Sequence, residues 1–260
     1  MNETIIIESD SPLRPSLKEV EKIIEYEFKN KDLLKEAFTH YSYKDNDSCQ
    51  SYDRLEYLGD SFLNLMIAKE HYFLYPKMTS GELTRLRAAN IDTEALARAA
   101  FKHGLHRFLR HQDHLFDERI QELMEGIKEY PLHSTGLIHP PKIFADILES
   151  LVGAIYVDTN LSVDATWEVV KNLLQPLTRP ENLKLNPVTR LNEMCQKIGI
   201  KLEYKDLWDD RGEIEIYVGD KLIGSGNNKN KKTIAKNKAA AQAYENLIKQ
   251  LAIKDGSICF

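Results

Sequence analysis

Residues 53–66 read DRLEYLGDSFLNLM, and this stretch combines an apolar helix face with three acids. On a helical wheel at about 100° per residue, one face collects five large apolar side chains. These are Leu55, Leu58, Phe62, Leu65 and Met66. Asp53, Glu56 and Asp60 share one narrow arc beside that face. Because like charges at positions i and i+4 repel, an isolated helix gains nothing from placing Glu56 and Asp60 together.

A second acidic pair lies in FADILESLVGAIY, residues 144–156, where Asp146 and Glu149 are i,i+3 neighbours in apolar sequence. If the two helices pack together, four carboxylates converge. Converging carboxylate oxygens are the ligands that Mg²⁺ takes, and the metal would offset their mutual repulsion. The alternative is that each pair lies on the solvated face of an amphipathic helix.

Gly59 interrupts the first of these helices. A glycine inside a helix costs about 1 kcal/mol relative to alanine. Its presence predicts either a close approach of another helix or simple tolerance of a small residue where helices cross.

Composition and charge indicate two domains with different roles. The chain has 260 residues, 42% of them hydrophobic, which is enough for a substantial core. Residues 187–252 carry 12 Lys and Arg against 9 Asp and Glu, whereas residues 1–186 carry 22 against 30. Cys49, Cys195 and Cys259 are scattered without a C-x-x-C pair, so neither a zinc ribbon nor a disulfide framework is implied, and a reducing compartment fits best. The acidic N-terminus does not resemble a signal or transit peptide, and the longest apolar run, residues 151–157, is too short for a membrane span.

The periodicity of the chain divides it into five parts. Residues 1–16 are expected to be a flexible lead-in. Helical periodicity dominates residues 17–177, although residues 111–141 contain one short helical pattern followed by a loop rich in proline, glycine and histidine. Residues 178–186 form a proline-containing linker. Residues 187–252 read as a helix, three short strands and a helix, and residues 253–260 form a tail. The predicted fold class is therefore multidomain, an all-α domain followed by a small α+β (α-β-β-β-α) domain.

Four segments of the helical region resemble, in order, the motifs of the ribonuclease III endonuclease domain. They are AFTHYSY (37–43), DRLEYLGDSFL (53–63), GELTRLRAANI (81–91) and ADILESLVGAIYVD (145–158). The C-terminal part resembles a double-stranded RNA-binding domain, in its first helix, PVTRLNEMCQKIG (187–199), and in the lysine-rich loop and helix KNKKTIAKNKAAAQAYENL (229–247). The two resemblances together cover most of the chain.

The resemblance implies a metal-dependent nuclease. It makes Glu56, Asp60, Asp146 and Glu149 both catalytic residues and ligands for Mg²⁺, with Mn²⁺ as a substitute. Asp53 stands where the family usually has glutamate and is assigned an assisting role. No protein nucleophile is needed, because a metal-bound water can attack phosphorus.

The same resemblance implies a homodimer that cleaves both strands of duplex RNA, leaving 5′-phosphate and 3′-hydroxyl ends with short 3′ overhangs. Tyr57, Phe62 and Leu65 are expected at the dimer contact or in the core. Two competing functions are a catalytically inactive protein that binds or sequesters double-stranded RNA, and a regulator whose nuclease domain only dimerises. The presence of all four acids favours the active enzyme.

The expected RNA contacts lie mainly around the start of the last helix. A lysine cluster there comprises Lys229, Lys231, Lys232, Lys236 and Lys238. A helix N-terminus favours phosphate, although a charge run is also typical of a solvated face. Thr189 and Glu193 are candidates for 2′-hydroxyl contacts or ordinary surface residues. The connection DDRG (209–212) lacks the Gly-Pro-x-His stretch of the family, which predicts weaker duplex binding.

Three further features leave alternatives open. His103, His106, His111 and His114 could hold zinc, but packing or RNA contact is favoured because no cysteines join them. An exposed Cys195 could make RNA binding redox-sensitive, whereas a buried one is inert. Residues 111–141 exceed the compact bacterial pattern and favour a eukaryotic, plant-like member that processes ribosomal RNA or small-RNA precursors in the nucleus or cytoplasm.

Overall fold

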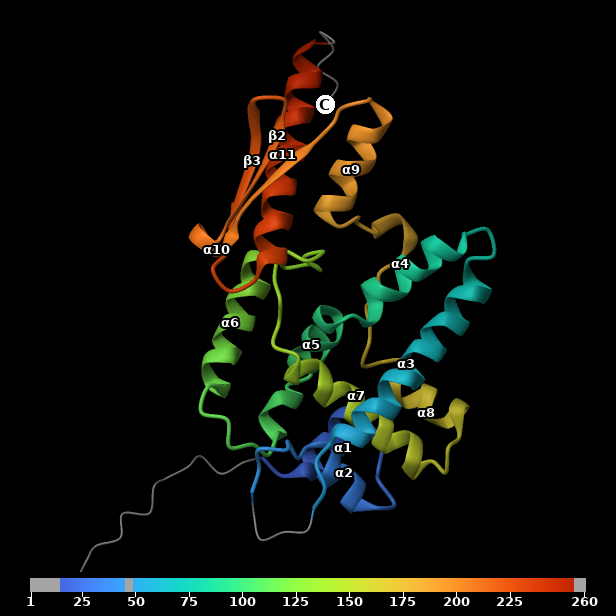
Figure 1. Cartoon of the computed structure of the whole chain (residues 1–260). Coiled ribbons are helices and arrows are strands. Elements are labelled where there is room, and N and C mark those ends of the chain that lie inside the picture. The colour runs from blue at the N-terminus through green and yellow to red at the C-terminus, as the bar shows by residue number, and fades with distance from the viewer. Residues whose placement is uncertain (1–14, 45–48, 255–260) are drawn as a thin grey trace, which may run out of the picture. The chain divides into compact units, whose positions relative to one another are not determined.

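The computed structural model describes residues 15–44 and 49–254 (Figure 1). Most of the expected N-terminal lead-in and most of the C-terminal tail lie outside these ranges. The chain divides into two compact units, Met1–Ile120 with Pro141–Leu177 and Gln121–Pro140 with Thr178–Phe260. Within the described ranges, no helix combines the length and apolar character needed to cross a membrane.

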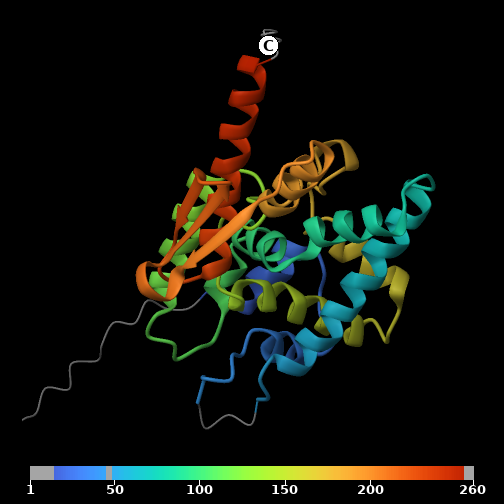
Figure 2. The same ribbon diagram turned by 45° about the horizontal axis from the view of Figure 1, so that its top comes forward.

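The first unit is helical and is built around α7 (Ile143–Asp158). Fourteen of its residues are buried, as expected of a helix that is apolar on all sides. Four helices pack against α7: α2 (Lys31–Ala37), α3 (Asp53–Leu74), α5 (Thr93–Lys102) and α8 (Val163–Val170). Figure 2 shows α3 crossing α7. The unit also contains α1 (Leu17–Ile24), α4 (Ser80–Ile91) and the short helix η1 (Leu105–Phe108).

Local sequence fixes where several of these helices begin. Thr79 accepts a hydrogen bond from the backbone of Glu82, whose carboxylate accepts one from the backbone of Thr79, so α4 starts with a complete capping box. Asp92 ends α4 and caps α5 through its side chain, so two separate helices follow each other here. Ser16 caps α1, and its side chain accepts a hydrogen bond from the backbone N–H of Lys18.

The second unit contains the predicted α-β-β-β-α module. Its elements are α9 (Pro187–Lys197), β1 (Glu203–Leu207), α10 (Trp208–Arg211), β2 (Glu213–Val218), β3 (Lys221–Asn227) and α11 (Lys232–Lys254). The strands form an antiparallel sheet in the order β1-β2-β3. Part of the connection DDRG, residues 209–211, belongs to the short helix α10, which sequence reading treated as a loop.

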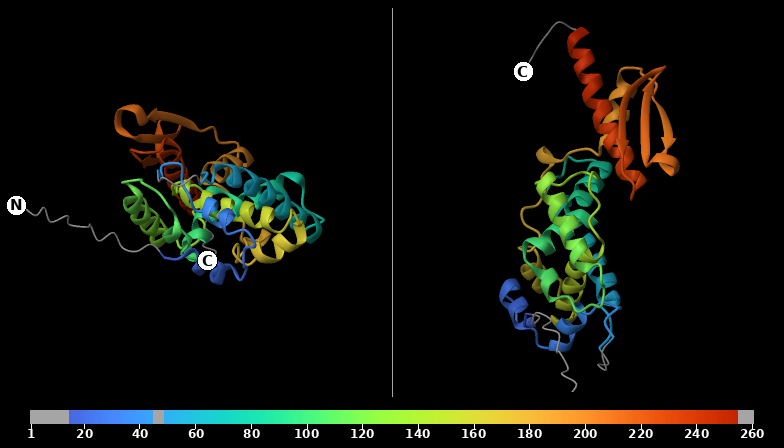
Figure 3. Two further views of the ribbon diagram at one scale, coloured as in Figure 1. Left: turned by 90° about the horizontal axis from the view of Figure 1, so that it is seen from below. Right: turned by 90° about the vertical axis from the view of Figure 1, so that its left-hand side faces the viewer.

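The alanines of α11 allow this helix to lie directly on the sheet, as Figure 3 shows. A Cβ atom at Gly224 would lie 2.4 Å from the carbonyl oxygen of Ala239, and one at Gly226 would lie 2.2 Å from that of Ala235. Glycine on β3 and alanine on α11 are therefore required by the same close approach. Larger side chains on either element would push the helix off the sheet.

One segment lies in a different unit from the one that sequence periodicity assigned. We expected residues 111–141 within the helical nuclease region, but residues 121–140 group with the C-terminal module. The unit boundary falls inside α6 (Phe116–Glu129). The linker contains a single short turn, η2 (Pro180–Asn182).

Candidate metal centre

Two glycines bring α3 and α7 into backbone contact. A Cβ atom at Gly59 would lie 1.8 Å from the carbonyl oxygen of Glu149, and one at Gly153 would lie 2.1 Å from that of Leu55. Both positions are buried, and neither can hold a larger residue without separating the helices. Gly59 is thus explained by close helix packing, one of the two readings that the sequence allowed.

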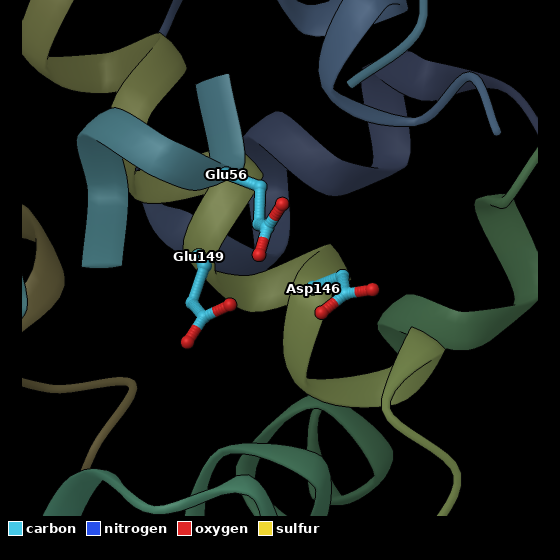
Figure 4. Close-up of side chains that lie close together, drawn as sticks. All are labelled: Glu56, Asp146 and Glu149. Carbon is cyan, nitrogen blue, oxygen red and sulfur yellow. The ribbon is translucent and has the colours of Figure 1, made fainter. Parts of the chain in front are cut away.

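The crossing places three acids together. Carboxylate oxygens of Glu56, Asp146 and Glu149 all lie within 4.8 Å of one another. Glu56 comes from α3 and the other two from α7, and Figure 4 shows the three side chains gathered at this crossing. Asp146 is 7% and Glu149 8% exposed, so these are not the solvated carboxylates of an amphipathic helix. A cluster of hard oxygen donors of this kind fits a divalent cation such as Mg²⁺.

The electrostatics of the cluster show the cost of assembling it. Burial, reinforced by the charges of Asp146 and Asp60, raises the pKa of Glu149 to about 7. Burial also raises the pKa of Asp146, although the hydrogen bond from Lys142 opposes this. Removing solvent from carboxylates and placing them side by side disfavours their charged forms. A cation between them would relieve both effects.

Lys142 supplies a positive charge at this point. Its Nζ donates hydrogen bonds of 2.6 Å to Glu56 Oε1 and to Asp146 Oδ1. Burial disfavours the charge on Lys142, but these two hydrogen bonds and the nearby negative charges raise its pKa well above the usual range. The ammonium group lies where it bridges ligands from both helices. The arrangement of the acids therefore favours a positive charge at this point, which the Lys142 ammonium supplies.

Asp60 is held apart from the three clustered acids. It is exposed, and its Oδ1 accepts a 2.8 Å hydrogen bond from Asn64 Nδ2. Arg87 in turn donates to Asn64 Oδ1 at 2.9 Å. Although Asp60 is outside the 4.8 Å cluster, its charge is close enough to raise the pKa of Glu149.

Asp53, the expected assisting residue, also lies outside the cluster. It is exposed at the start of α3 and accepts a hydrogen bond from Ser51. Tyr52, which sequence reasoning did not single out, reaches the site instead and donates to Asp146 Oδ2 at 3.1 Å. Burial and the charge of Asp146 raise the pKa of Tyr52, which keeps its hydroxyl protonated as a donor.

Comparison with known proteins places this arrangement in a family. The family model for the ribonuclease III domain matches residues 53–160, and that for the double-stranded RNA binding motif matches residues 187–247. The chain is 43% identical over 234 residues to Ribonuclease 3-like protein 3 of Oryza sativa subsp. japonica, covering 88% of this chain and 77% of that protein. The chain belongs to the ribonuclease III family. It is a ribonuclease III-type endoribonuclease with a double-stranded RNA-binding domain.

Two further known proteins are similar to this chain. Ribonuclease 3-like protein 2 of Arabidopsis thaliana is 41% identical over 238 residues, covering 89% of this chain and 60% of that protein. A solved structure of the nuclease domain of ribonuclease III from Campylobacter jejuni is 28% identical, covers 62% of this chain and 96% of that chain, and has a TM-score of 0.47.

The lysines of this ribonuclease III's RNA-binding domain differ in their surroundings. Lys229 and Lys231 are exposed, whereas Lys232 pairs with Asp206. The Nζ of Lys236 lies 5.0 Å from the ring centroid of Tyr204. The cluster therefore surrounds the start of α11, as predicted. Two of its members are already held by β1 through Asp206 and Tyr204.

The first helix of the domain supplies weaker candidates. Thr189 and Glu193 on α9 are both partly exposed. They stay candidate contacts to 2′-hydroxyl groups. Cys195 is only 2% exposed and lies in the domain core, so it fits the alternative of a buried, inert thiol and not that of an exposed, redox-sensitive one.

The four histidines of residues 103–114 do not form a metal site among the described residues, where the three-ligand cluster found is the acidic one. His106 stacks on Phe101 with ring centroids 4.6 Å apart, and the ring centroids of His111 and Phe116 are 4.0 Å apart. His103 is within hydrogen-bonding distance of the carbonyl oxygen of Leu173, at 3.1 Å. His106 and His111 therefore pack against aromatic rings, and His103 contacts the backbone.

Proposed function

We propose that this protein cleaves both strands of duplex RNA by Mg²⁺-assisted hydrolysis, giving 5′-phosphate and 3′-hydroxyl ends with short 3′ overhangs. The observation that carries this proposal is the convergence of Glu56, Asp146 and Glu149 within 4.8 Å at the α3–α7 crossing. When bound, Mg²⁺ would lower the pKa of a coordinated water and stabilise charge on the phosphate and the leaving oxygen. Glu56, Asp146 and Glu149 would hold the ion, with Asp60 as the fourth acid at the exposed side.

The surrounding residues prepare these ligands. Tyr52 fixes one oxygen of Asp146, and Asn64, held by Arg87, fixes Asp60. Glu149, whose pKa is about 7, has to lose its proton before it can act as an anionic ligand. The ammonium of Lys142 occupies the negative potential between α3 and α7 and would compete with an entering cation.

An active enzyme is favoured over an inactive RNA-binding protein by the burial of the acids. Two carboxylates that are more than nine-tenths buried side by side are costly to keep, and RNA binding by a separate module does not need them. An inactive protein would tolerate apolar or amide replacements at Asp146 and Glu149. The regulator alternative, in which the domain only dimerises, meets the same objection.

A homodimer is supported by an apolar stripe on α3. Tyr57, Leu65 and Tyr72 are 76%, 59% and 67% exposed, and all three project within about 80° of one another on the helix. Phe62, in contrast, is 4% exposed and packs against Tyr156, so it belongs to the core. We propose that the exposed stripe is covered by a second copy, and Leu65→Glu should then convert a dimer to a monomer in sedimentation.

Cleavage of long duplex RNA tests the enzyme proposal directly. The parent protein with Mg²⁺ should produce short duplexes with 5′-phosphate ends, and the Glu149→Ala variant should produce none while still binding RNA. Binding without cleavage by the parent would support the inactive alternative. Processing of ribosomal or small-RNA precursors, and residence in the nucleus or cytoplasm, stay predictions that substrate sequencing and a fluorescent fusion would test.

A further inference from the structure

A turn at residues 134–136 is docked on the RNA-binding domain. Asn237 Nδ2, on α11, donates a 2.6 Å hydrogen bond to the carbonyl oxygen of Gly136. Asn186 Nδ2, at the start of α9, donates to the carbonyl oxygen of Thr135 at 3.0 Å and to Asn237 Oδ1 at 3.1 Å. The pair Asn186 and Asn237 thus binds two consecutive backbone carbonyls of the docked turn, residues Ser134–Gly136.

The turn has a conformation suited to this contact. Thr135 and Gly136 have φ values of 58° and 93°, and Ser134 Oγ accepts hydrogen bonds from the backbone of Leu137 and Ile138. A Cβ atom at Gly136 would lie 2.6 Å from Asn237 Nδ2. Asn237 itself is 8% exposed, and both its Nδ2 and its Oδ1 atoms form hydrogen bonds within this contact. Glycine is therefore needed at residue 136 both for its backbone conformation and for the approach of Asn237.

The contact lies within the lysine cluster. Asn237 is flanked by Lys236 and Lys238, and after burial the positive charge of Lys231 is the main influence that lowers the pKa of His139. The segment that carries the docked turn thus runs beside the start of α11, where duplex phosphates are expected.

The same segment leads directly to the metal ligands. Pro140 ends the portion assigned to the second unit, and Lys142, two residues later, bridges Glu56 and Asp146. Two residues span at most about 7 Å. The chain passes between the two units at residues 120/121, 140/141 and 177/178, instead of through the 178–186 linker alone.

We propose that the docked turn is a positioning element that ties the RNA-binding domain to the start of α7, so that a duplex held by the lysine cluster is presented to the metal site. This inference rests on the proposed cleavage of duplex RNA. A domain tethered at three points samples a smaller volume than one held by a single linker, so its bound duplex has a higher effective concentration at the site. The turn would therefore raise cleavage efficiency and narrow the positions of the cuts without changing duplex affinity.

Two full-chain variants release the turn in different ways. Asn186→Asp keeps the side-chain oxygen that caps α9 at Val188 but loses the amide donor to Thr135. Gly136→Ala introduces a Cβ atom against Asn237. Gly199→Ala is the matched control, because Gly199 also has a positive φ, of 71°, but a Cβ atom there would meet nothing within 4 Å.

Three measurements on each variant test the proposal. Hydrogen exchange should accelerate at least tenfold at residues 134–138 in Asn186→Asp and Gly136→Ala but not in Gly199→Ala. Duplex affinity, measured without divalent cations, should stay within twofold of the parent for Gly136→Ala. The kcat/KM for duplex cleavage should fall at least fivefold in both turn variants, and the cut positions should spread over more nucleotides.

The outcomes separate the two parts of the claim. Unchanged exchange would show that the turn is not docked, and faster exchange with unchanged kcat/KM and cut positions would show that docking does not position the duplex. Either result overturns the proposal. If the parent does not cut duplex RNA, the proposed function fails and this positioning role fails with it, while the exchange measurement still shows whether the turn is docked.

Discussion

Gly59 on α3 and Gly153 on α7 face each other across a helix crossing so tight that a Cβ atom at either would overlap the opposite backbone. This contact sets the separation of the helices that carry Glu56 on one side and Asp146 and Glu149 on the other. The metal centre is thus a consequence of backbone packing as much as of the acids themselves.

Replacing Gly59 with alanine should therefore damage both stability and metal binding. The added methyl group would force the helices apart, and overpacking of this kind typically costs about 1–3 kcal/mol. We expect Gly59→Ala to lower the free energy of unfolding by about this amount and to remove most of the stabilisation of the folded state by Mg²⁺. Denaturant unfolding with and without Mg²⁺ measures both effects.

Gly81→Ala is the control for this substitution, because Gly81 lies in the first turn of α4 with nothing within 4 Å of an added Cβ atom. There the higher helix propensity of alanine should leave stability equal or slightly higher. If Gly59→Ala behaved like Gly81→Ala, the crossing would not be as tight as described.

The buried carboxyl of Glu149 should make the metal-free protein less stable as the pH rises. Its pKa is about 7 in the folded protein but about 4.3 in an unfolded chain. Between these values the folded state holds a proton that the unfolded state has lost, so stability falls with increasing pH and the loss is complete above pH 7. Without metal, Glu149→Gln should then be more stable than the parent at pH 8, by roughly 3–4 kcal/mol, and equally stable near pH 4.

Magnesium should reverse this difference. Because the ion compensates the charge on Glu149, its stabilisation of the parent should grow between pH 6 and pH 8, whereas Glu149→Gln should gain little at any pH. Thermal unfolding of both proteins with and without Mg²⁺ across this pH range shows whether the stabilisation by Mg²⁺ grows as the pH rises. A parent that gains the same stability from Mg²⁺ at both ends of the range would contradict the role given to Glu149.

Asp158 should show the opposite pH dependence. It is 7% exposed and accepts hydrogen bonds from the Tyr26 hydroxyl and from the backbone of Lys29 and Asn30. Although burial opposes ionisation, these hydrogen bonds lower its pKa. The stabilisation is present above the unfolded pKa of about 4 and is lost as the pH falls through the lower folded value.

Asp158→Asn should consequently lose about 1.5–3 kcal/mol at pH 7, the usual contribution of hydrogen bonds to a charged group. The difference from the parent should shrink as the pH is lowered below 4. Chemical unfolding at several pH values measures it, and a constant difference would show that the charge of Asp158 has no part in holding Tyr26, Lys29 and Asn30.

Because Asp206 pairs with Lys232, we predict that Asp206 weakens RNA binding. Asp206→Asn should release Lys232 and remove a negative charge from the lysine cluster, which strengthens duplex binding severalfold at low salt. Lys231→Ala should have the reverse effect and reduce the slope of log affinity against log salt by about 0.9. Binding titrations at several salt concentrations check both variants, and an unchanged slope in Lys231→Ala would remove this lysine from the interface.

The sequence predicted much of the fold and the acids of the site, because both depend on local patterns. Helical periodicity and alternation identified the two domain types, and the spacing of Asp146 and Glu149 placed both on one helix face. Gly153 carried no such signal, since its partner lies 94 residues away and only the crossing of two helices relates them. Lys142 had a weak signal in its i,i+4 spacing to Asp146, but its contact with Glu56 depends on tertiary packing.

The separation of Asp60 and Asp53 from the cluster was equally hidden. Both lie on the same side of α3 as Glu56. Asp60 is about one turn further along the helix and Asp53 is its first residue, and each position leaves the carboxylate outside the cluster. Docking of residues 134–136 on Asn186 and Asn237 involves backbone carbonyls, which no side-chain pattern reveals.

The most direct test of the account is a Mn²⁺ titration that follows free ion by electron paramagnetic resonance in the parent, Glu149→Gln and Asp53→Asn. If Glu56, Asp146 and Glu149 form the metal centre, Glu149→Gln should bind Mn²⁺ more than about tenfold more weakly than the parent. Asp53→Asn, which changes an acid outside the cluster, should bind within about twofold of it. Equal binding by the parent and Glu149→Gln would contradict the assignment of the metal centre.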